Sequence, residues 1–218
     1  MDWVNAALLI IIVIILMNIY EESWGKYGKN NIISYRGEDG IIYYIHAGHA
    51  RTPEEKRESL EVLALIQQRN IQLLRYLKKN FPSDIRTKRL LDNYNPDVIM
   101  ENSPKNKTGD TAYVVGKGNE FRMCIRSAYG YNPIHRDDLL TFVHLHELAH
   151  IASISYDHNY EFWHNFKWLL HRAEEAGVYT PVNYKNQPFE YCGLYVDYNP
   201  YYDRSKGEGA AAPLTPAI

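Results

Sequence analysis

The sequence predicts an α+β protein, in which a small antiparallel or mixed sheet packs with several helices behind one N-terminal transmembrane helix. Three observations predict this class. Residues 4–20 are an uncharged apolar run, short segments between residues 32 and 126 are typical of strands, and the apolar spacing after residue 134 is helical. With 218 residues, of which 45% are hydrophobic, the chain is long enough to bury one core.

Residues 4–20 are predicted to span a membrane. At 1.5 Å per residue, the run covers about 26 Å, which is near the short end of a bilayer span. Trp3, Tyr20 and Trp24 lie where aromatic residues are expected at the membrane surface. A cleaved signal peptide is the competing interpretation, but it lacks a positive N-terminal region, and residues 18–22 contain no small-residue cleavage site.

We therefore predict an uncleaved anchor at residues 1–22, which contacts the lipid bilayer through residues 4–20 and gives the protein a single-pass membrane location. Lys26, Lys29 and Arg36 follow the apolar run, whereas an acidic residue precedes it. The positive-inside rule then favours a cytoplasmic location for the rest of the chain.

Five short segments are predicted to be strands. Residues 32–35 and 41–45 flank a turn that contains glycine, which is typical of a hairpin, and residues 98–100 form a short apolar segment. Residues 111–115 and 121–126 flank a second glycine-containing turn, which predicts a second hairpin.

Four helices are predicted. The first begins after Thr52, where a capping Thr, a Pro and a Glu three residues later mark a helix start, and it ends near residue 80. Ser83 caps a shorter helix that ends at residue 91. Residues 134–155 and 157–176 form the last two helices.

The C-terminal residues complete the predicted organisation. Residues 178–203 are rich in Tyr, Pro and Asn and are expected to wrap the domain surface. The low-complexity tail, residues 204–218, is expected to be disordered. The chain is therefore divided into an anchor at residues 1–22, one domain at residues 23–203 and this tail.

The charge and the cysteines limit the partners. A formal net charge of −2 gives no general attraction to nucleic acid. Cations exceed anions between residues 51 and 89, which we interpret as a solvated helix face, with a groove for an anionic partner as the alternative. A nucleic-acid partner stays open but is not favoured. Cys124 and Cys192 are too few for a disulfide framework and fit a reducing compartment, with a single bridge left open.

The segment His146-Glu147-Leu148-Ala149-His150 carries the predicted chemistry. Two histidines four residues apart on a helix lie on one face, close enough to share a metal ion. Glu147 is rotated away from His146, so that it can reach a water on that metal without being a ligand. This arrangement is typical of zinc-dependent hydrolysis, with Glu147 as the general base.

A catalytic zinc site needs a third protein ligand, and His158 is the predicted one. On a continuous helix, His158 would lie about 12 Å above His150 and could not join it. The helix must therefore end between residues 151 and 157. Asp157 and Glu161 remain as competing ligands.

Other polar residues receive less specific interpretations. His144 is expected to point away from the metal, and Arg126 either binds substrate or, more commonly for Arg, forms an ion pair. No donor for a developing oxyanion can be singled out among the tyrosines, of which the candidates are Tyr160, Tyr191, Tyr195 and Tyr198.

These segments resemble the WLM-type, SprT-like zinc metallopeptidases. The resemblance rests on residues 123–127, 131–133, 139–141 and 144–150. In that family, a strand with an Arg precedes the motif helix, and the third ligand begins a His-Asn/Asp-x-x-Phe segment, which matches residues 158–162 here. The resemblance covers about residues 98–176.

The resemblance implies a zincin-like metallopeptidase domain that holds Zn²⁺ through His146, His150 and His158, with Glu147 as the catalytic residue. The sequence thus predicts a membrane-anchored zinc endopeptidase that acts on a protein or peptide substrate. The alternative is a structural or assembly protein on a retained zincin fold. Such a protein would tether a membrane to a protein shell, as a minor capsid protein of a large DNA virus does. A purely structural zinc ion is a third interpretation.

Overall fold

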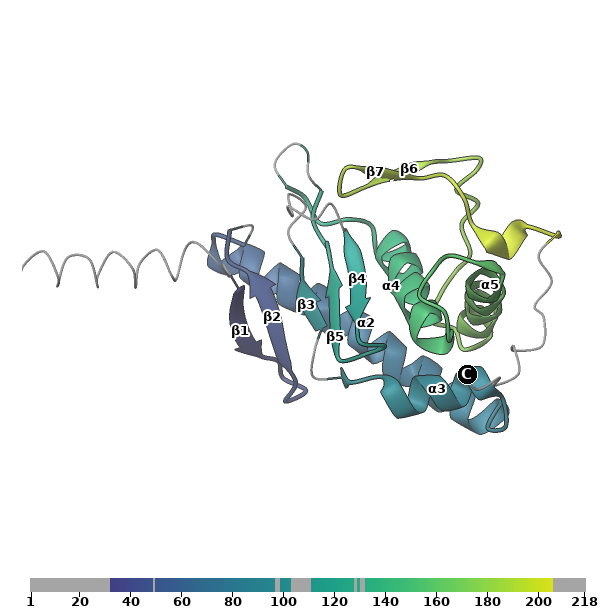
Figure 1. Ribbon diagram of the computed structural model, residues 1–218. Helices are drawn as coiled ribbons and strands as arrows, with labels where there is room; N and C mark the ends of the chain where they lie inside the picture. Colours follow the sequence, from purple (N-terminus) through teal and green to yellow (C-terminus); the bar gives the residue numbers. More distant parts are fainter. Residues whose placement is uncertain are drawn as a thin grey trace, which may run out of the picture.

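The computed structural model describes residues 32–48, 50–96, 99–102, 111–127, 129 and 132–205. Within these residues, four α-helices and two sheets form a mixed α/β arrangement (Figure 1). The larger sheet consists of β1 (Ile32–Arg36), β2 (Ile42–His46), β3 (Ile99–Glu101), β4 (Ala112–Val115) and β5 (Glu120–Met123). The helices are α2 (Pro53–Asn80), α3 (Ile85–Asn93), α4 (Asp137–Ala152) and α5 (Tyr160–Glu175).

The five-stranded sheet has the order β1-β2-β3-β5-β4. The outer pairs, β1 with β2 and β4 with β5, are antiparallel hairpins, as the sequence predicts. The inner pairs, β2 with β3 and β3 with β5, are parallel. A parallel pair needs a long crossover connection, and α2 and α3 supply the one between β2 and β3. This order leaves β4 at the edge of the sheet.

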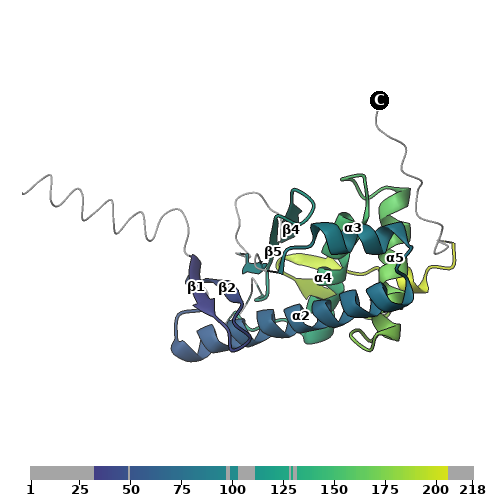
Figure 2. The ribbon, with the colours of Figure 1, turned by 90° about the horizontal axis from the view of Figure 1, so that it is seen from below.

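Helix α2 supports both the sheet and the helices, and it runs along the length of the described domain (Figure 2). Its start is the predicted capping box. The Thr52 side chain accepts a hydrogen bond from the Glu55 N–H at 3.1 Å, and the Glu55 carboxylate accepts one from the Thr52 N–H at 2.9 Å. The predicted helix is therefore confirmed almost to the residue.

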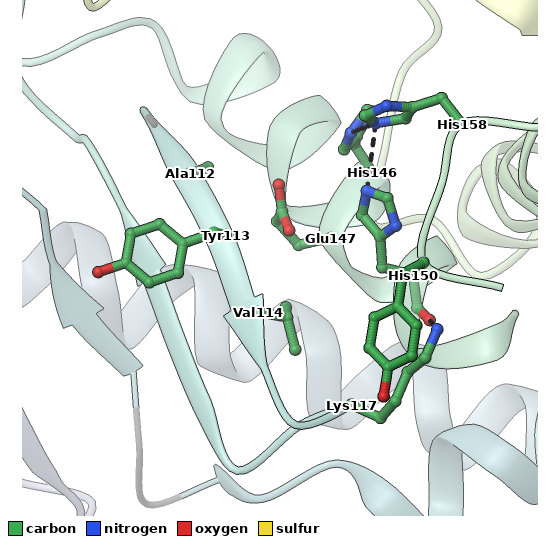
Figure 3. A pocket seen from close by; sticks show the side chains of 9 residues that line it. Ala112, Tyr113, Val114, Lys117, His146, Glu147, His150 and His158 are labelled. Atoms are coloured by element: carbon green, nitrogen blue, oxygen red, sulfur yellow. Dashed lines mark hydrogen bonds between the residues drawn. The ribbon is translucent and has the colours of Figure 1, made fainter. Parts of the chain in front are cut away.

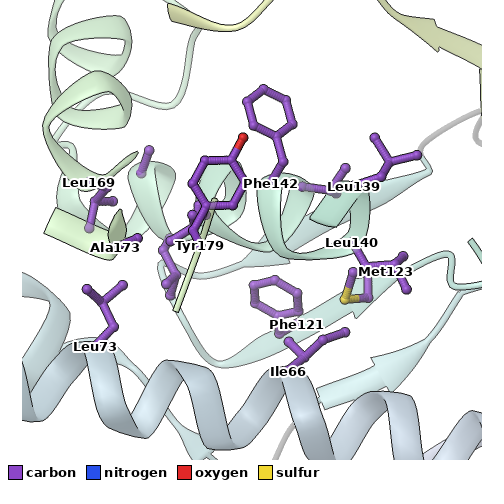
Figure 4. Packing of buried hydrophobic residues seen from close by; sticks show 14 of the residues in the cluster. Ile66, Leu73, Phe121, Met123, Leu139, Leu140, Phe142, Leu169, Ala173 and Tyr179 are labelled. Carbon is purple, nitrogen blue, oxygen red and sulfur yellow. The ribbon is translucent and has the colours of Figure 1, made fainter. Parts of the chain in front are cut away.

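The hydrophobic core lies between α2, the sheet and α4. Ile66 and Leu73 of α2 face Phe121 and Met123 of β5, and α4 adds Leu140 (Figure 4). Each of these side chains is at most 2% exposed. Full burial of one such side chain contributes about 1.5–3 kcal/mol. Helix α4, which carries His146, Glu147 and His150, packs on the sheet, on α3 and on α5. Most of its surface is therefore buried, and the helix is held rigidly.

A second hairpin element follows the helices. Strands β6 (Phe189–Tyr191) and β7 (Leu194–Val196) pair antiparallel, and the short 3-10 helix η2 (Pro200–Tyr202) follows. Figure 1 shows this hairpin over α4 and α5. A disulfide joins Cys192, in the β6–β7 turn, to Cys124, just after β5. The single bridge that the sequence left open is therefore formed.

Several predicted boundaries differ from the structure by a few residues, and hydrogen bonds explain two of the helix starts. Helix α4 begins at Asp137 rather than at residue 134, because Ile134 pairs with Arg126 in an isolated bridge. Helix α3 is capped by Asp84 rather than by Ser83, since the Asp84 side chain accepts the N–H of Arg86. In both cases, a hydrogen bond that the spacing of apolar residues does not reveal decides where the helix starts.

The predicted fold class, an α+β zincin-like domain joined to a transmembrane helix, is contradicted by the structure. The described residues form a mixed α/β fold whose two hairpins are joined through parallel pairing with β3. The sequence shows each hairpin, but the pairing between them joins segments that are separated by two helices. Local alternation carries no information about such a pairing.

Across the described ranges, no helix is both long and apolar enough to cross a membrane. The longest, α2, has 28 residues but carries charged side chains along its length. This finding contradicts the predicted transmembrane helix and the predicted single-pass, cytoplasm-facing membrane location. The predicted anchor at residues 1–22, with its bilayer contact at residues 4–20, lies outside the described residues. So do residues 206–218 of the predicted tail.

Candidate metal centre

The three histidines predicted as ligands lie together at the junction of α4 and α5. His146 and His150 are one turn apart on α4, with ring centroids 5.1 Å apart. His158 comes from the segment between the helices. Its Nε2 atom is 2.9 Å from Nε2 of His146 and 3.2 Å from Nε2 of His150 (Figure 3). Three ring nitrogens therefore converge on one point.

This convergence depends on the predicted break between the helices. Helix α4 ends at Ala152, and Ser153 is extended, with φ −96° and ψ 150°. Helix α5 begins only after Asn159, whose side chain accepts the N–H of Phe162 at 3.2 Å. The chain thus turns back, and His158 reaches the pair on α4.

Lys117 stabilises the end of α4. Its Nζ atom donates to the carbonyl oxygens of His150, at 2.8 Å, and Ser153, at 2.9 Å, and also to that of Ser155. The last carbonyls of a helix have no partner within the helix, and a cation at this end is electrostatically favourable. Lys117 lies in the turn between β4 and β5, so the sheet edge and the motif helix are joined at the site.

Glu161, a competing third ligand, is used to shape the segment between the helices. Its carboxylate accepts the N–H groups of Ile154, at 2.9 Å, and Ser155, at 3.1 Å. It also pairs with Arg89 at 3.3 Å. Among the three candidates, His158 is the one whose ligand atom lies within 4.8 Å of those of His146 and His150.

Phe162 holds the three imidazole rings in place. Its ring centroid lies 4.8 Å from that of His146, 4.4 Å from that of His150 and 4.6 Å from that of His158. Phe162 is fully buried, so its ring is a fixed surface against which the histidines pack. Phe162, four residues after His158, is therefore a structural part of the histidine cluster.

Burial keeps the three histidines neutral. Burial is the largest reason why the pKa of His146 falls to about 3 and that of His150 to about 4, and the neighbouring histidines contribute to both values. The pKa of His158 is also lowered, again mainly by burial. Neutral imidazole is the form that binds a metal, so these side chains need not lose a proton near pH 7.

The histidines open into a pocket of about 250 Å³. Glu147, which is 4% exposed, lies between strand β4 and the histidines in Figure 3. The pocket is lined by Ala112, Tyr113, Val114, Lys117, His146, Glu147, His150, Tyr156 and His158. Its walls are therefore the sheet edge on one side and the ligand residues on the other.

Arg126 does not line this pocket. It is 3% exposed, and its Nη2 atom donates to the carbonyl oxygen of Glu55 at 2.7 Å and to Ser59 Oγ at 3.2 Å. Its Nε atom is 3.9 Å from the carboxylate of Glu101. Arg126 thus ties the segment after β5 to α2. In the described structure, it contacts other parts of the protein interior and does not face the pocket.

The other predictions for polar residues have mixed outcomes. His144 does not line the pocket, and it packs on Phe121 with ring centroids 4.6 Å apart. The tyrosines among the pocket-lining residues are Tyr113 and Tyr156. Neither was among the four candidates, Tyr160, Tyr191, Tyr195 and Tyr198. The sequence offered no signal for them, because strand β4 and the segment between the helices meet only in the fold.

Comparisons with known proteins bear on the family. No family model matches the chain. No solved structure matches it either, so none supports the predicted zincin-like fold. A protein of Acanthamoeba polyphaga mimivirus, named Uncharacterized protein R325, is 33% identical over 146 residues, which are 65% of this chain and 73% of that protein. The chain therefore belongs to the same family as this mimivirus protein.

Proposed function

We propose that the protein is a zinc-dependent endopeptidase that hydrolyses a protein or peptide substrate. The observation that carries the proposal is the convergence of three imidazole nitrogens beside the buried carboxylate of Glu147, in a pocket at the edge of a sheet. The similarity of residues 123–162 to the WLM-type metallopeptidases supports the same reaction class.

The donor set fits zinc. His146, His150 and His158 would hold the ion through three neutral imidazole nitrogens, which is a ligand type that zinc prefers. Three protein ligands leave a position open, as in catalytic zinc sites, whereas structural sites are closed by a fourth protein ligand. When bound there, zinc supplies Lewis-acid chemistry, because it makes water acidic enough to lose a proton near neutral pH and polarises a carbonyl group.

Glu147 is the residue that would move the proton. It adjoins His146 on α4 and lines the same pocket, so its carboxylate is held beside the reacting groups by a rigid helix. As a general base, it accepts a proton from the attacking water. It then returns this proton to the amine nitrogen that leaves when the peptide bond breaks.

Strand β4 offers a means of binding an extended peptide. It is the last strand in the sheet order and lines the pocket with Ala112 and Val114. An extended chain can add to such an edge through main-chain hydrogen bonds, which are largely independent of side-chain identity. This position would place a peptide bond between β4 and Glu147, and it favours a peptide over a small-molecule substrate.

The test combines zinc content with hydrolysis of fluorescently labelled, denatured casein. Wild type is expected to retain one zinc ion and to cleave casein. Glu147→Gln should keep the zinc and lose about 10²–10⁴ of the rate, the usual contribution of a general base. Glu61→Gln is the matched control, since it makes the same change at an exposed position of α2, where Glu61 pairs with Arg57. Equal rates for wild type and Glu147→Gln would overturn the mechanism.

The same measurements, together with unfolding after zinc removal and water exchange at the metal, separate the other interpretations of the sequence. A structural or assembly role stays a prediction. It would be favoured by a protein that binds zinc, cleaves no casein and is unaffected by Glu147→Gln. A purely structural zinc ion would be favoured if zinc removal unfolded the protein and no water exchanged at the metal.

A further inference from the structure

A second group of ligand-type side chains lies apart from the pocket. The Cys124 and Cys192 sulfurs and a ring nitrogen of His135 all lie within 4.8 Å of one another. Nε2 of His135 is 3.2 Å from the sulfur of Cys192. None of these residues lines the pocket of the histidine cluster. The three come from separate segments: the end of β5, the approach to α4 and the β6–β7 turn.

The surroundings of this group suit a metal. Cys124 is fully buried, and Cys192 is 4% exposed. The carbonyl oxygen of Arg126 is 3.0 Å from the sulfur of Cys124 and 3.1 Å from that of Cys192. A carbonyl oxygen repels thiolates, so the reduced cysteines would keep their protons and donate S–H to it until a bound cation displaces those protons.

His135 presents an imidazole nitrogen near the two sulfurs. The backbone N–H of Cys192 donates to its Nε2 atom at 3.3 Å, so this nitrogen carries a lone pair, and a metal bound there would replace this hydrogen bond. The ring packs on Tyr191, with centroids 5.2 Å apart, which fixes its orientation. A disulfide alone does not need an imidazole nitrogen beside it. Two cysteines and one histidine, however, are a donor set that zinc prefers.

We propose that the Cys124–Cys192 bridge is one of two exclusive states, and that in the reduced protein Cys124, His135 and Cys192 bind one zinc ion. A dithiol reductant transfers two electrons and two protons to the S–S bond and becomes a disulfide itself, which leaves two thiols. Zn²⁺ then displaces the two thiol protons and is held by both sulfurs and the imidazole nitrogen. A disulfide oxidant takes two electrons from the thiolates, re-forms the bridge and releases the ion.

Both states attach the β6–β7 hairpin to the end of β5. The bridge spans a sequence separation of 68, and the metal would join the same two cysteines. Only a reduced, metal-free protein would lack this attachment. The group would thus keep the hairpin in place under oxidising conditions and, when zinc is present, under reducing conditions as well.

The experiment measures zinc stoichiometry in the full chain, oxidised or treated with a phosphine reductant, after removal of free metal. The reduced protein is expected to hold one more zinc ion than the oxidised protein. Cobalt added in place of zinc should give a thiolate-to-cobalt charge-transfer absorption in the reduced protein only. Equal stoichiometry in the two states would overturn the proposal, whether or not the reduced protein stays folded.

Two variants identify the group that binds the additional ion. His135→Ala keeps both cysteines and should bind the additional zinc at least about 10- to 100-fold more weakly, the range seen when even an outer-shell partner is lost. His158→Ala should lose the pocket zinc but keep the additional ion on reduction. Zinc should also raise the midpoint of thermal unfolding of the reduced wild type, and not that of reduced His135→Ala. An additional ion that binds His135→Ala as tightly as wild type would contradict the assignment.

Because the pocket zinc is counted in both redox states, the two proposals fail separately. A protein that gains zinc on reduction but holds none when oxidised would contradict the proposed peptidase and support the second group. A protein with one zinc ion in both states would support the zinc site of the proposed peptidase and contradict the second group.

Discussion

The histidine cluster and the cysteine–histidine group are built in different ways. His146 and His158 are only 12 residues apart, the first on α4 and the second in the segment that follows this helix. Cys124 and Cys192 are 68 residues apart, and a hairpin must fold back over the domain to join them. The first group has only nitrogen donors and is insensitive to reductants, whereas the second changes its chemistry when it is reduced.

The two groups also differ in what holds them. The histidine cluster relies on helix termini, since Lys117 caps α4 and Glu161 shapes the following segment. The cysteine–histidine group relies on the segment around Arg126, whose side chain is fixed by α2 and by Glu101. Damage to one support should therefore leave the other group intact. The predictions below test this independence, beginning with the largest expected effect.

Removal of the bridge should have the largest effect on stability. In Cys124→Ala combined with Cys192→Ala, we expect the free energy of unfolding in the oxidised state to fall by about 4 kcal/mol, because the bridge closes a long loop. Urea denaturation measures it. The zinc content of the histidine cluster should not change, and a loss below about 1 kcal/mol would contradict the role of the bridge.

Glu101 should make stability depend on pH. Burial raises its pKa from 4.5 to about 7, against the opposing effects of the His46 N–H and the Arg126 charge. The folded protein therefore binds one more proton than the unfolded chain between these values. Stability should then fall as pH rises from about 4.5 to 7, by roughly 3 kcal/mol at most.

Glu101→Gln should remove this slope. Its unfolding free energy, measured by urea denaturation at several pH values, should exceed that of wild type near pH 7 and approach it near pH 4.5. Parallel curves for the two proteins would show that Glu101 does not titrate in this range. Metal binding by the histidine cluster, whose pocket is not lined by Glu101, serves as the control.

Lys117→Met should weaken the support of the histidine cluster. It leaves carbonyl oxygens of His150 and Ser153 without their donor, at a cost of about 1–3 kcal/mol. The zinc affinity of the pocket should fall as well, because His158 is placed by the segment that Lys117 holds. Lys79→Met, at an exposed position in the last turn of α2, is the matched control. Unchanged affinity in Lys117→Met would show that the cap does not position the ligand.

Thr52→Ala should have the smallest effect. It removes the capping hydrogen bond at the start of α2 and should cost about 1 kcal/mol. No residue of α2 lines the pocket of the histidine cluster, so the zinc content of that cluster should stay at the wild-type level. A change in metal content would mean that α2 couples to the sites more strongly than its contacts indicate.

Much of the histidine cluster could be predicted from the sequence. The spacing of His146 and His150 places them on one helical face, and the length of a continuous helix requires a break before His158. The choice of His158 over Glu161 was not decided in this way. In the structure, the Glu161 carboxylate binds the backbone of Ile154 and Ser155, whereas a ring nitrogen of His158 lies beside those of His146 and His150. Lys117 showed only as part of a turn, because its partners lie more than 30 residues away.

The sequence by itself determined the features that act over a few residues. These are the capping box at Thr52, the two strand hairpins, the helix breaks and the metal-binding motif, since each depends on neighbours within one or two turns of the chain. Only the tertiary structure decided the parallel pairing of β3, the Lys117 cap and the meeting of Cys124, His135 and Cys192. These contacts join distant segments, and the hydrophobic core, rather than any local pattern, brings them together.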